Sequence, residues 1–259
     1  MAEHYFQGDG ITLYAADAEA ALARLATGSV DCVVTRVPRW RPPGGSDRHQ
    51  AGGPRWRDVR LGREPTPPDY ADRLRGVFAE LRRVVRDTGT VWLNVGAPRA
   101  AAVPAEAAGM PWRVVFALQR DDWILRNAVV WRRSRSAVPV AGRLSPCYET
   151  LFLLTKKPRY YFNFDSIRER SGKSRVIGDV WPSGEAAGAD LPVEVAARCV
   201  AVGCPAGGVV LDPFSGSAAS GVAARGLGCT YVGIDVDTRR HIAALCRFGL
   251  ADIQHRSAA

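Results

Sequence analysis

Residues Val209–Asp237 read VVLDPFSGSAASGVAARGLGCTYVGIDVD and carry the strongest structural signal in the chain. An apolar strand runs into Asp212, a turn of small residues follows at Ser215-Gly216-Ser217, and a helix and a second strand lead to Asp235. This is the order of a nucleotide-binding strand–helix–strand unit, in which a glycine lets the backbone approach a ligand closely. The acid after the second strand can accept hydrogen bonds from ribose hydroxyl groups. No GxGxxG sequence occurs here, so a dinucleotide site is not expected.

Strands and helices alternate over the rest of the 259-residue chain as well. Val30–Thr35 is a β-branched apolar run, typical of a strand that is buried on both faces. Asp69–Arg86 has apolar residues at helical spacing, Asp87-Thr88-Gly89 is expected to end that helix, and Thr90–Val95 is expected to be the next strand. Arg159–Phe164 is also expected to be extended. The sequence therefore predicts an α/β fold with a Rossmann-like, doubly wound and mainly parallel sheet.

The composition narrows the class of protein. With 47% hydrophobic and 24% charged residues, the chain is neither disordered nor fibrous. No apolar run approaches the roughly 18–20 residues that span a bilayer, and the N-terminus has no signal-peptide pattern, so we expect a cytoplasmic protein. The six cysteines and four histidines lack the spacing of metal ligands, so no metal site is predicted.

The net charge is +9, and nearly all of the positive residues are arginines. Two segments are especially rich in them. Arg36–Pro68 holds eight arginines, three acids and two tryptophans, and Arg132–Arg143 holds four arginines and no acid. Such clusters suit contacts with nucleic-acid phosphates, and aromatic side chains can stack on bases. A solvated surface loop and the arginine bias of a G+C-rich genome are the alternative explanations. The candidate phosphate contacts are Arg41, Arg55, Arg57, Arg132, Arg133, Arg135 and Arg143.

The segment Leu211–Ser217, LDPFSGS, resembles the DPFxGSG motif of S-adenosylmethionine-dependent DNA amino-methyltransferases, which methylate exocyclic amines of cytosine or adenine. Its place near the C-terminus resembles the circularly permuted motif order called the β class. Other segments match that order from about Gly10 to Phe248, namely Tyr14–Ser29, Phe78–Val95, Pro111–Trp131, Tyr148–Phe162 and Asp179-Val180-Trp181. The resemblance implies one methyltransferase domain over residues 1–259. Its catalytic half would be 10–165, a short target-recognition or linker segment 166–190, and its cofactor-binding half 191–250.

The resemblance also implies which residues hold the cofactor. Four would line the methionine end of S-adenosylmethionine: Asp212, Phe214, Gly216 and Ser217. Pro213 would belong to the same cofactor site. Asp235 would take the ribose hydroxyls, Asp17 would lie near the adenine, and Pro192 with the helix after it would complete the pocket. Each acid taken singly has an alternative role as a helix cap or turn residue. The chain departs from the family pattern at Ala218, where a glycine is usual, and at Ala187, where a histidine is common.

At the catalytic position the family carries Asp/Ser/Asn-Pro-Pro-Tyr/Phe, whereas this chain has Thr35-Arg36-Val37-Pro38-Arg39-Trp40. An exocyclic amine is a poor nucleophile because its lone pair is delocalised. In the family, hydrogen-bond acceptors therefore orient the amine, and the aromatic residue stacks on a base rotated out of the duplex. Arg36 stands at the acceptor position, Val37 at the first proline and Arg39 at the aromatic residue. The form Thr-x-x-Pro-x-Trp resembles the cytosine-N4 branch.

The predicted function is S-adenosylmethionine-dependent methylation of an exocyclic amine in duplex DNA, with cytosine N4 favoured and a restriction enzyme as an implied partner. Arginine offers donors and no acceptor. Its charge opposes the sulfonium, and a repulsion of about 1–4 kcal/mol would slow transfer roughly 5- to 1000-fold. One alternative is therefore an impaired or inactive homologue that binds DNA with or without the cofactor. Another is a methyltransferase that acts on RNA or on a small amine.

Overall fold

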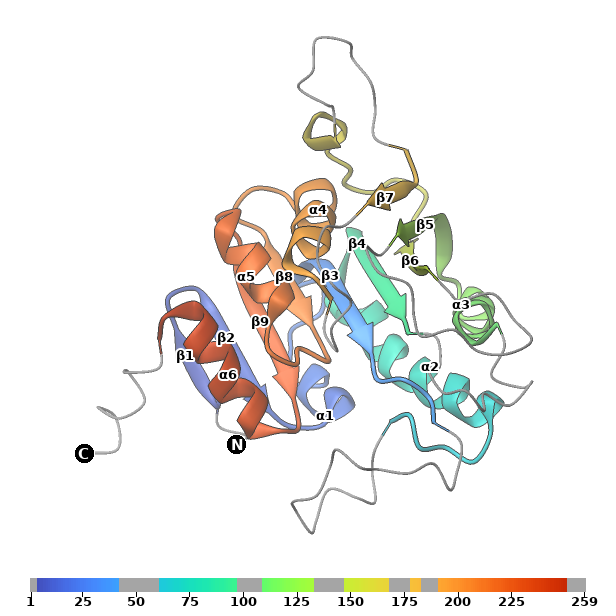
Figure 1. Cartoon of the computed structure of the whole chain (residues 1–259), viewed down its shortest axis with the longest axis horizontal. Helices are drawn as coiled ribbons and strands as arrows, with labels where there is room; N and C mark the ends of the chain where they lie inside the picture. The colour runs from blue at the N-terminus through green and yellow to red at the C-terminus, as the bar shows by residue number, and fades with distance from the viewer. Residues whose placement is uncertain are drawn as a thin grey trace.

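The computed structural model describes residues 4–41, 61–96, 109–132, 147–167, 178–182 and 191–250. In these ranges nine strands form one sheet, in the order β1-β2-β9-β8-β3-β4-β6-β5-β7 (Figure 1). The strands are β1 (Phe6–Gly8), β2 (Ile11–Ala15), β3 (Val30–Val37), β4 (Val85–Val95), β5 (Ile124–Arg132), β6 (Tyr148–Thr155), β7 (Val180–Pro182), β8 (Val209–Asp212) and β9 (Thr230–Asp235). The helices are α1 (Ala18–Leu22), α2 (Pro67–Val84), α3 (Met110–Arg120), α4 (Val193–Gly203), α5 (Ala219–Gly226), α6 (Thr238–Phe248) and the 3-10 helix η2 (Phe164–Ile167).

Five consecutive strands of the sheet, β2, β9, β8, β3 and β4, are parallel to one another. The strand β6 is antiparallel to both of its neighbours, β4 and β5, and β1 is antiparallel to β2. The predicted mainly parallel α/β sheet is therefore confirmed. The strands β3 and β8 lie far apart along the chain but are adjacent and parallel in the sheet. Their carboxyl ends therefore meet at one edge of it. That edge is where ligands bind in folds of this type.

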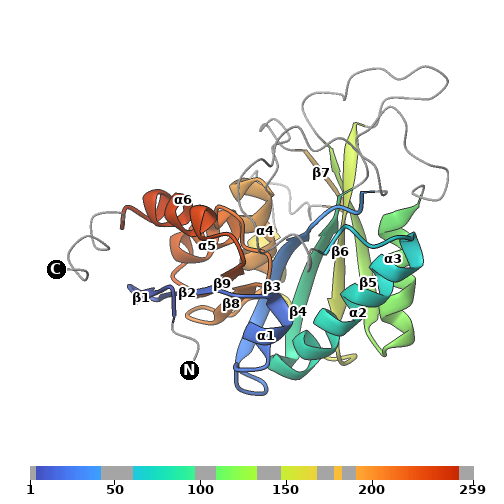
Figure 2. The same cartoon turned by 90° about the horizontal axis from the view of Figure 1, so that it is seen from below.

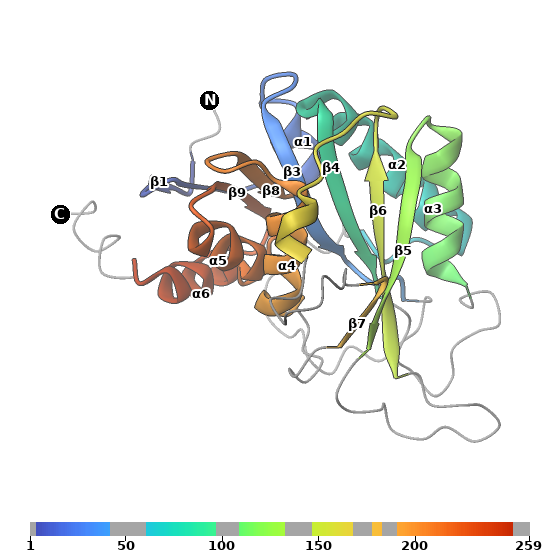
Figure 3. The ribbon, with the colours of Figure 1, turned by 90° about the horizontal axis from the view of Figure 1, so that it is seen from above.

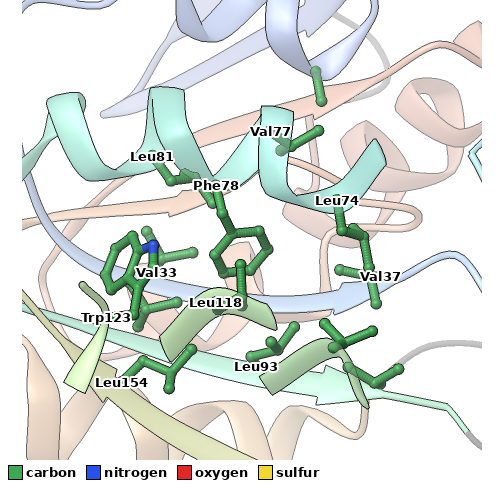
Figure 4. Packing of buried hydrophobic residues seen from close by; sticks show 14 of the residues in the cluster. Val33, Val37, Leu74, Val77, Phe78, Leu81, Leu93, Leu118, Trp123 and Leu154 are labelled. Atoms are coloured by element: carbon green, nitrogen blue, oxygen red, sulfur yellow. The ribbon is translucent and has the colours of Figure 1, made fainter. Parts of the chain in front are cut away.

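The helices cover both faces of the sheet. Figures 2 and 3 show α1, α2 and α3 together on one face, and α4, α5 and α6 on the other. Phe78 of α2 lies at the centre of the first apolar layer, with its ring edge-on to Trp123 at a centroid distance of 6.0 Å (Figure 4). The second layer packs α4 against Trp92 and Val34 of the central strands. No helix in the described ranges is both long and apolar enough to cross a membrane.

The predicted helix Asp69–Arg86 and the turn expected after it both differ from the structure. The helix α2 begins two residues earlier than expected because Thr66 and Asp69 form a capping box. Asp87-Thr88-Gly89 does not form a separate turn. These residues lie within β4, where the register with β3 jumps from the pair Val30–Val85 to the pair Cys32–Thr90. A side chain at position 89 would approach the Asp31 carbonyl oxygen to 2.9 Å, so glycine is needed where the irregular strand passes β3.

The predicted extended segment Arg159–Phe164 does not pair as a strand. Its backbone reaches two separate elements instead: Tyr161 N donates to Thr88 O at 2.7 Å, and Asn163 N donates to Val202 O at 2.8 Å. Hydrogen bonds to two different partners do not form a ladder, and the chain then turns into η2 at Phe164. The segment is therefore a strap that joins β4 to α4.

Candidate active site

A buried carboxylate connects the ends of β8 and β3. Asp212, the last residue of β8, accepts hydrogen bonds at 2.7 Å from Thr35 Oγ1 of β3 and at 2.7 Å from Ser220 Oγ of α5. The backbone N–H of Phe214 donates to the same carboxylate at 3.1 Å. Thr35, which begins the catalytic segment, is therefore in direct contact with the acid that begins the cofactor motif.

Burial controls the protonation of this carboxylate. Desolvation raises the pKa of Asp212 to about 6, although the hydrogen bonds from Ser220 and Thr35 lower it. Three donors around one carboxylate stabilise its charged form, but they do not fully replace water. Asp212 is thus poised to gain stabilisation from a cation placed beside it.

A second carboxylate lies at the end of the neighbouring strand β9. Asp235 Oδ2 accepts from Gly216 N at 3.0 Å, and its Oδ1 accepts from Asp237 N at 2.9 Å. Gly216 has a φ of 52°, in the left-handed region that glycine adopts without strain. Burial raises the pKa of Asp235 as well. Asp212 and Asp235 therefore flank the Gly216 turn, as the strand–helix–strand order predicts.

A pocket opens beside Asp212 at the same edge of the sheet. It is lined by Arg36, Leu191, Asp212, Phe214, Ser215, Ala219 and Ser220. The lining combines an aromatic ring, two hydroxyl groups and a carboxylate, and these groups suit a nucleoside that carries a positive charge. The chemistry of the lining residues therefore fits S-adenosylmethionine. Arg36 is also one of the lining residues, and its positive charge has the opposite effect on a cation.

Three other cofactor candidates have local roles or partners. Asp17 caps α1 and accepts from Glu19 N at 3.0 Å, Pro192 is the N-cap residue of α4, and Ser217 Oγ accepts from Arg247 Nη1 at 2.7 Å. Ala218 is fully buried with a φ of 57°, so an alanine occupies a backbone conformation that favours glycine. Contacts of Asp17, Pro192 and Ser217 with the cofactor stay predictions, and Ala187 lies outside the described residues.

The Arg36 side chain forms a buried ion pair. Its Nη2 lies 2.9 Å from Glu149 Oε2 of β6, and the two side chains are 7% and 6% exposed. Arg39 also contacts Glu149, with Nη2 and Oε1 3.5 Å apart. The two arginines of the catalytic segment therefore share a carboxylate. Sequence reasoning missed Glu149, whose only signal is that it is the one charged residue of strand β6.

The remaining residues of the catalytic segment pack against the protein. Pro38 O accepts from the Tyr70 hydroxyl at 2.6 Å, and Val37 is buried against α2. Trp40 is 4% exposed, and its indole N–H donates to Glu64 O at 2.9 Å. Trp40 is therefore a core residue in this conformation, and only its departure from the core would let it stack on a base.

Two of the candidate DNA contacts lie in the described residues. Arg41 follows β3, and Arg132 is the last residue of β5, paired with Tyr148 and Pro182. Both residues are exposed. The strands β3 and β5 run in the same direction, so the two arginines lie at the edge of the sheet that carries the pocket. The others, Arg55, Arg57, Arg133, Arg135 and Arg143, lie outside the described residues.

Solved structures share the fold. The PvuII DNA methyltransferase, which is cytosine-N4-specific, matches with a TM-score of 0.79 over 98% of this chain and 94% of that chain, at 15% identity. TTHA0409 from Thermus thermophilus, in complex with S-adenosyl-L-methionine, matches with a TM-score of 0.69 over 92% of this chain and 94% of that chain, at 22% identity. At these identities the likeness shows the fold alone, and it confirms the predicted Rossmann-like methyltransferase architecture.

Sequence relatives are closer. The type II methyltransferase M.Cfr9I of Citrobacter freundii is 35% identical, over 88% of this chain and 84% of the relative. M.XycI of Xanthomonas campestris pv. cyanopsidis is 34% identical, with the same two coverages of 88% and 84%. The model of the DNA methylase family, for N6 and N4 methyltransferases, matches residues 31–244. The hydrogen bond between Thr35 and Asp212 agrees with these matches. The matches show that the chain belongs to the DNA methylase family of N6 and N4 amino-methyltransferases.

Proposed function

We propose that the protein transfers the methyl group of S-adenosylmethionine to an exocyclic amine of a DNA base, and that the base is cytosine, methylated at N4. The hydrogen bond between Thr35 and Asp212 carries the proposal, because it holds the catalytic segment against the cofactor motif. Cytosine is supported by the form Thr35-x-x-Pro38-x-Trp40 and by the shared fold of the cytosine-N4-specific PvuII enzyme.

The cofactor supplies an electrophilic methyl group on a sulfonium. The Asp212 carboxylate would attract that positive charge, and Asp235 would accept hydrogen bonds from the ribose through lone pairs that Gly216 and Asp237 leave available. The carbonyl oxygens of Arg36 and Val37 are the candidate acceptors that would orient the amine. The carbonyl oxygen of Pro38 already accepts from Tyr70.

The DNA substrate would lie across the edge of the sheet that carries the carboxyl ends of β3 and β5. Arg41 and Arg132 are exposed at this edge and would hold phosphates. The target base would have to leave the duplex, because its amine is inaccessible to the pocket while the base is stacked. The planar guanidinium of Arg39 could then stack on the base in place of the family's aromatic ring.

A second candidate function is DNA binding with little or no methyl transfer. Arg36 favours it, because a donor-only side chain stands where the family has an acceptor, and it is held there by Glu149. In this form the chain would keep the cofactor pocket and the basic edge while lacking the group that orients the amine.

Calorimetry with S-adenosylmethionine, together with tritiated-methyl transfer to varied duplex DNA, tests the two functions. We expect cofactor binding that Asp235→Ala weakens strongly, and label in N4-methylcytosine after DNA hydrolysis. Label in N6-methyladenine would contradict the choice of cytosine. Cofactor binding without label on any DNA would leave the second function, and no binding by the wild-type chain would overturn the proposal.

A further inference from the structure

Charged and polar side chains form a row on the α4-facing side of the sheet, next to the pocket. Asp212 of β8, Arg36 of β3 and Glu149 of β6 lie at the carboxyl edge of the parallel strands, and Asn94 of β4 pairs in register with Arg36. The neighbours of these residues on the same face, such as Trp92 and Leu151, belong to the apolar layer under α4. The row therefore runs from the cofactor motif to a strand that the cofactor motif does not touch.

Arg36 connects the two ends of this row. Arg36 lines the pocket together with Asp212 and Phe214, and its guanidinium reaches Glu149 of β6, 2.9 Å away. Both side chains of the ion pair are more than nine-tenths buried, so water screens their charges little. A guanidinium carried by a residue of this wall disfavours a cation in the pocket unless a carboxylate offsets its charge.

We propose that Glu149 sets the charge of the cofactor pocket: by pairing with Arg36, it lets a pocket with an arginine in its wall accept a sulfonium. Glu149 is a positioning residue in this role and touches neither cofactor nor base. The inference rests on the proposed function, because it concerns the same pocket. It also assigns a consequence to the unusual Arg36, since this arginine needs a carboxylate partner where the family's serine or asparagine would need none.

A purely structural role for the ion pair makes a different prediction. A pair that only ties β3 to β6 would, when broken, weaken binding of every ligand in the pocket to the same extent. A charge-setting pair acts on cations alone. S-adenosylmethionine and S-adenosylhomocysteine differ by the methyl group and the positive charge on sulfur, so the ratio of their affinities isolates the charge.

The experiment measures both ligands by calorimetry with the full chain and with Glu149→Gln. We expect the variant to lose about five- to tenfold in affinity for S-adenosylmethionine relative to S-adenosylhomocysteine. Arg36→Gln should shift the ratio in the opposite direction, because it removes the opposing charge and leaves Glu149 in contact with Arg39. An unchanged ratio in a folded Glu149→Gln variant would overturn the proposal.

Two features keep the test decisive. If Glu149→Gln does not fold, the double variant Arg36→Gln with Glu149→Gln replaces it, since it leaves no unpaired arginine at position 36. Its relative affinity for S-adenosylmethionine falls below that of Arg36→Gln under the proposal and equals it under a structural role. Asp121→Asn is the matched control, because it breaks the 2.6 Å ion pair of Asp121 with Arg75 between α3 and α2 and should leave the ratio at the wild-type value. Absence of binding of both ligands to the wild-type chain would instead refute the proposed function, so the two failures are distinguishable.

Discussion

Burial of Asp212 has two opposing effects: it lets the side chain join three elements, and it makes the carboxylate costly to ionise. Asp212 is buried where β8 ends, and it receives hydrogen bonds from Thr35 and Ser220, so it fixes the relative position of three elements. A buried carboxylate is nevertheless costly to ionise, and the pKa of Asp212 is raised to about 6. The conflict is resolved when a cation lies beside it. Under the proposed function, the site would therefore give up some stability without cofactor in order to bind a cationic one.

The pH dependence of folding provides a measurement of this cost. Because the folded pKa of Asp212 is about 6 and lies above the unfolded value, the folded chain binds more protons between about pH 4 and 6. The contribution of Asp212 to stability therefore falls as pH rises through this window, by about 3 kcal/mol. Urea unfolding should show Asp212→Asn gaining stability over the wild type at pH 7.5 but not at pH 4.5.

Asp121 is a control of opposite sign for that experiment. A hydrogen bond from Arg75 lowers the pKa of Asp121, so its stabilising contribution is present at neutral pH and is lost as pH falls through its folded pKa. Asp121→Asn should therefore lose stability relative to the wild type at pH 7.5. Identical pH profiles for the two variants would show that burial of Asp212 does not govern its titration.

Ala218 illustrates strain at the residue scale. Its φ of 57° costs an L-amino acid about 1–2 kcal/mol, whereas Ala224 of α5 has an ordinary helical conformation and is equally buried. Ala→Gly at position 224 should cost about 1 kcal/mol in helix propensity, in addition to the loss of a buried methyl group. The same change at position 218 should be less destabilising by at least about 1 kcal/mol, because it relieves the strain. Equal losses in denaturant unfolding would contradict this explanation.

At the scale of elements, the end of β3 depends on β6. Restoring a family-like segment with Arg36→Ser, Val37→Pro and Arg39→Tyr removes both arginines that contact Glu149. Breaking a buried ion pair by removing one side costs about 3–5 kcal/mol, so the triple variant should lose about that much stability. Adding Glu149→Gln should recover most of the loss, and chemical denaturation of both variants measures it.

The same pair of variants reports on catalysis. If Arg36 is what limits methyl transfer, the quadruple variant should transfer tritiated methyl faster than the wild type, because an acceptor and an aromatic ring then stand at positions 36 and 39. A wild type that is as fast as a folded quadruple variant would show that Arg36 and Arg39 support the reaction as they are.

The sequence predicts elements better than it predicts their partners. The second strand of the motif is observed at Thr230–Asp235 and ends on Asp235 as predicted, and Asp212 and Asp235 flank the predicted turn, because local periodicity and a short motif specify both. Glu149 was not predictable, since its contact with Arg36 spans 113 residues and depends on β6 being inserted antiparallel beside β4. The Gly89 irregularity was likewise hidden, because a glycine after a helix also signals a turn.

At the scale of the whole molecule, the positions of the exposed arginines say more about DNA binding than the net charge does. The chain carries a net charge of +9, and Arg41 and Arg132 are exposed at the edge of the sheet that holds the pocket. Arg120, at the end of α3, is also exposed, but it precedes β5 and so lies toward the opposite edge. A general attraction of DNA to a basic protein would treat these three arginines alike, whereas docking on the pocket edge would not.

The salt dependence of DNA binding separates these two cases. Each arginine that contacts a phosphate contributes about one unit to the slope of log affinity against log salt concentration. Replacing Arg41 and Arg132 by Gln should therefore weaken binding of a duplex and reduce the slope by about two, with the loss greatest at low salt. Arg120→Gln should leave the slope within about half a unit of the wild type. If Arg120→Gln reduces the slope as much per arginine as the double variant does, the DNA has no preferred edge, and the placement of the substrate over the Thr35–Asp212 site is wrong.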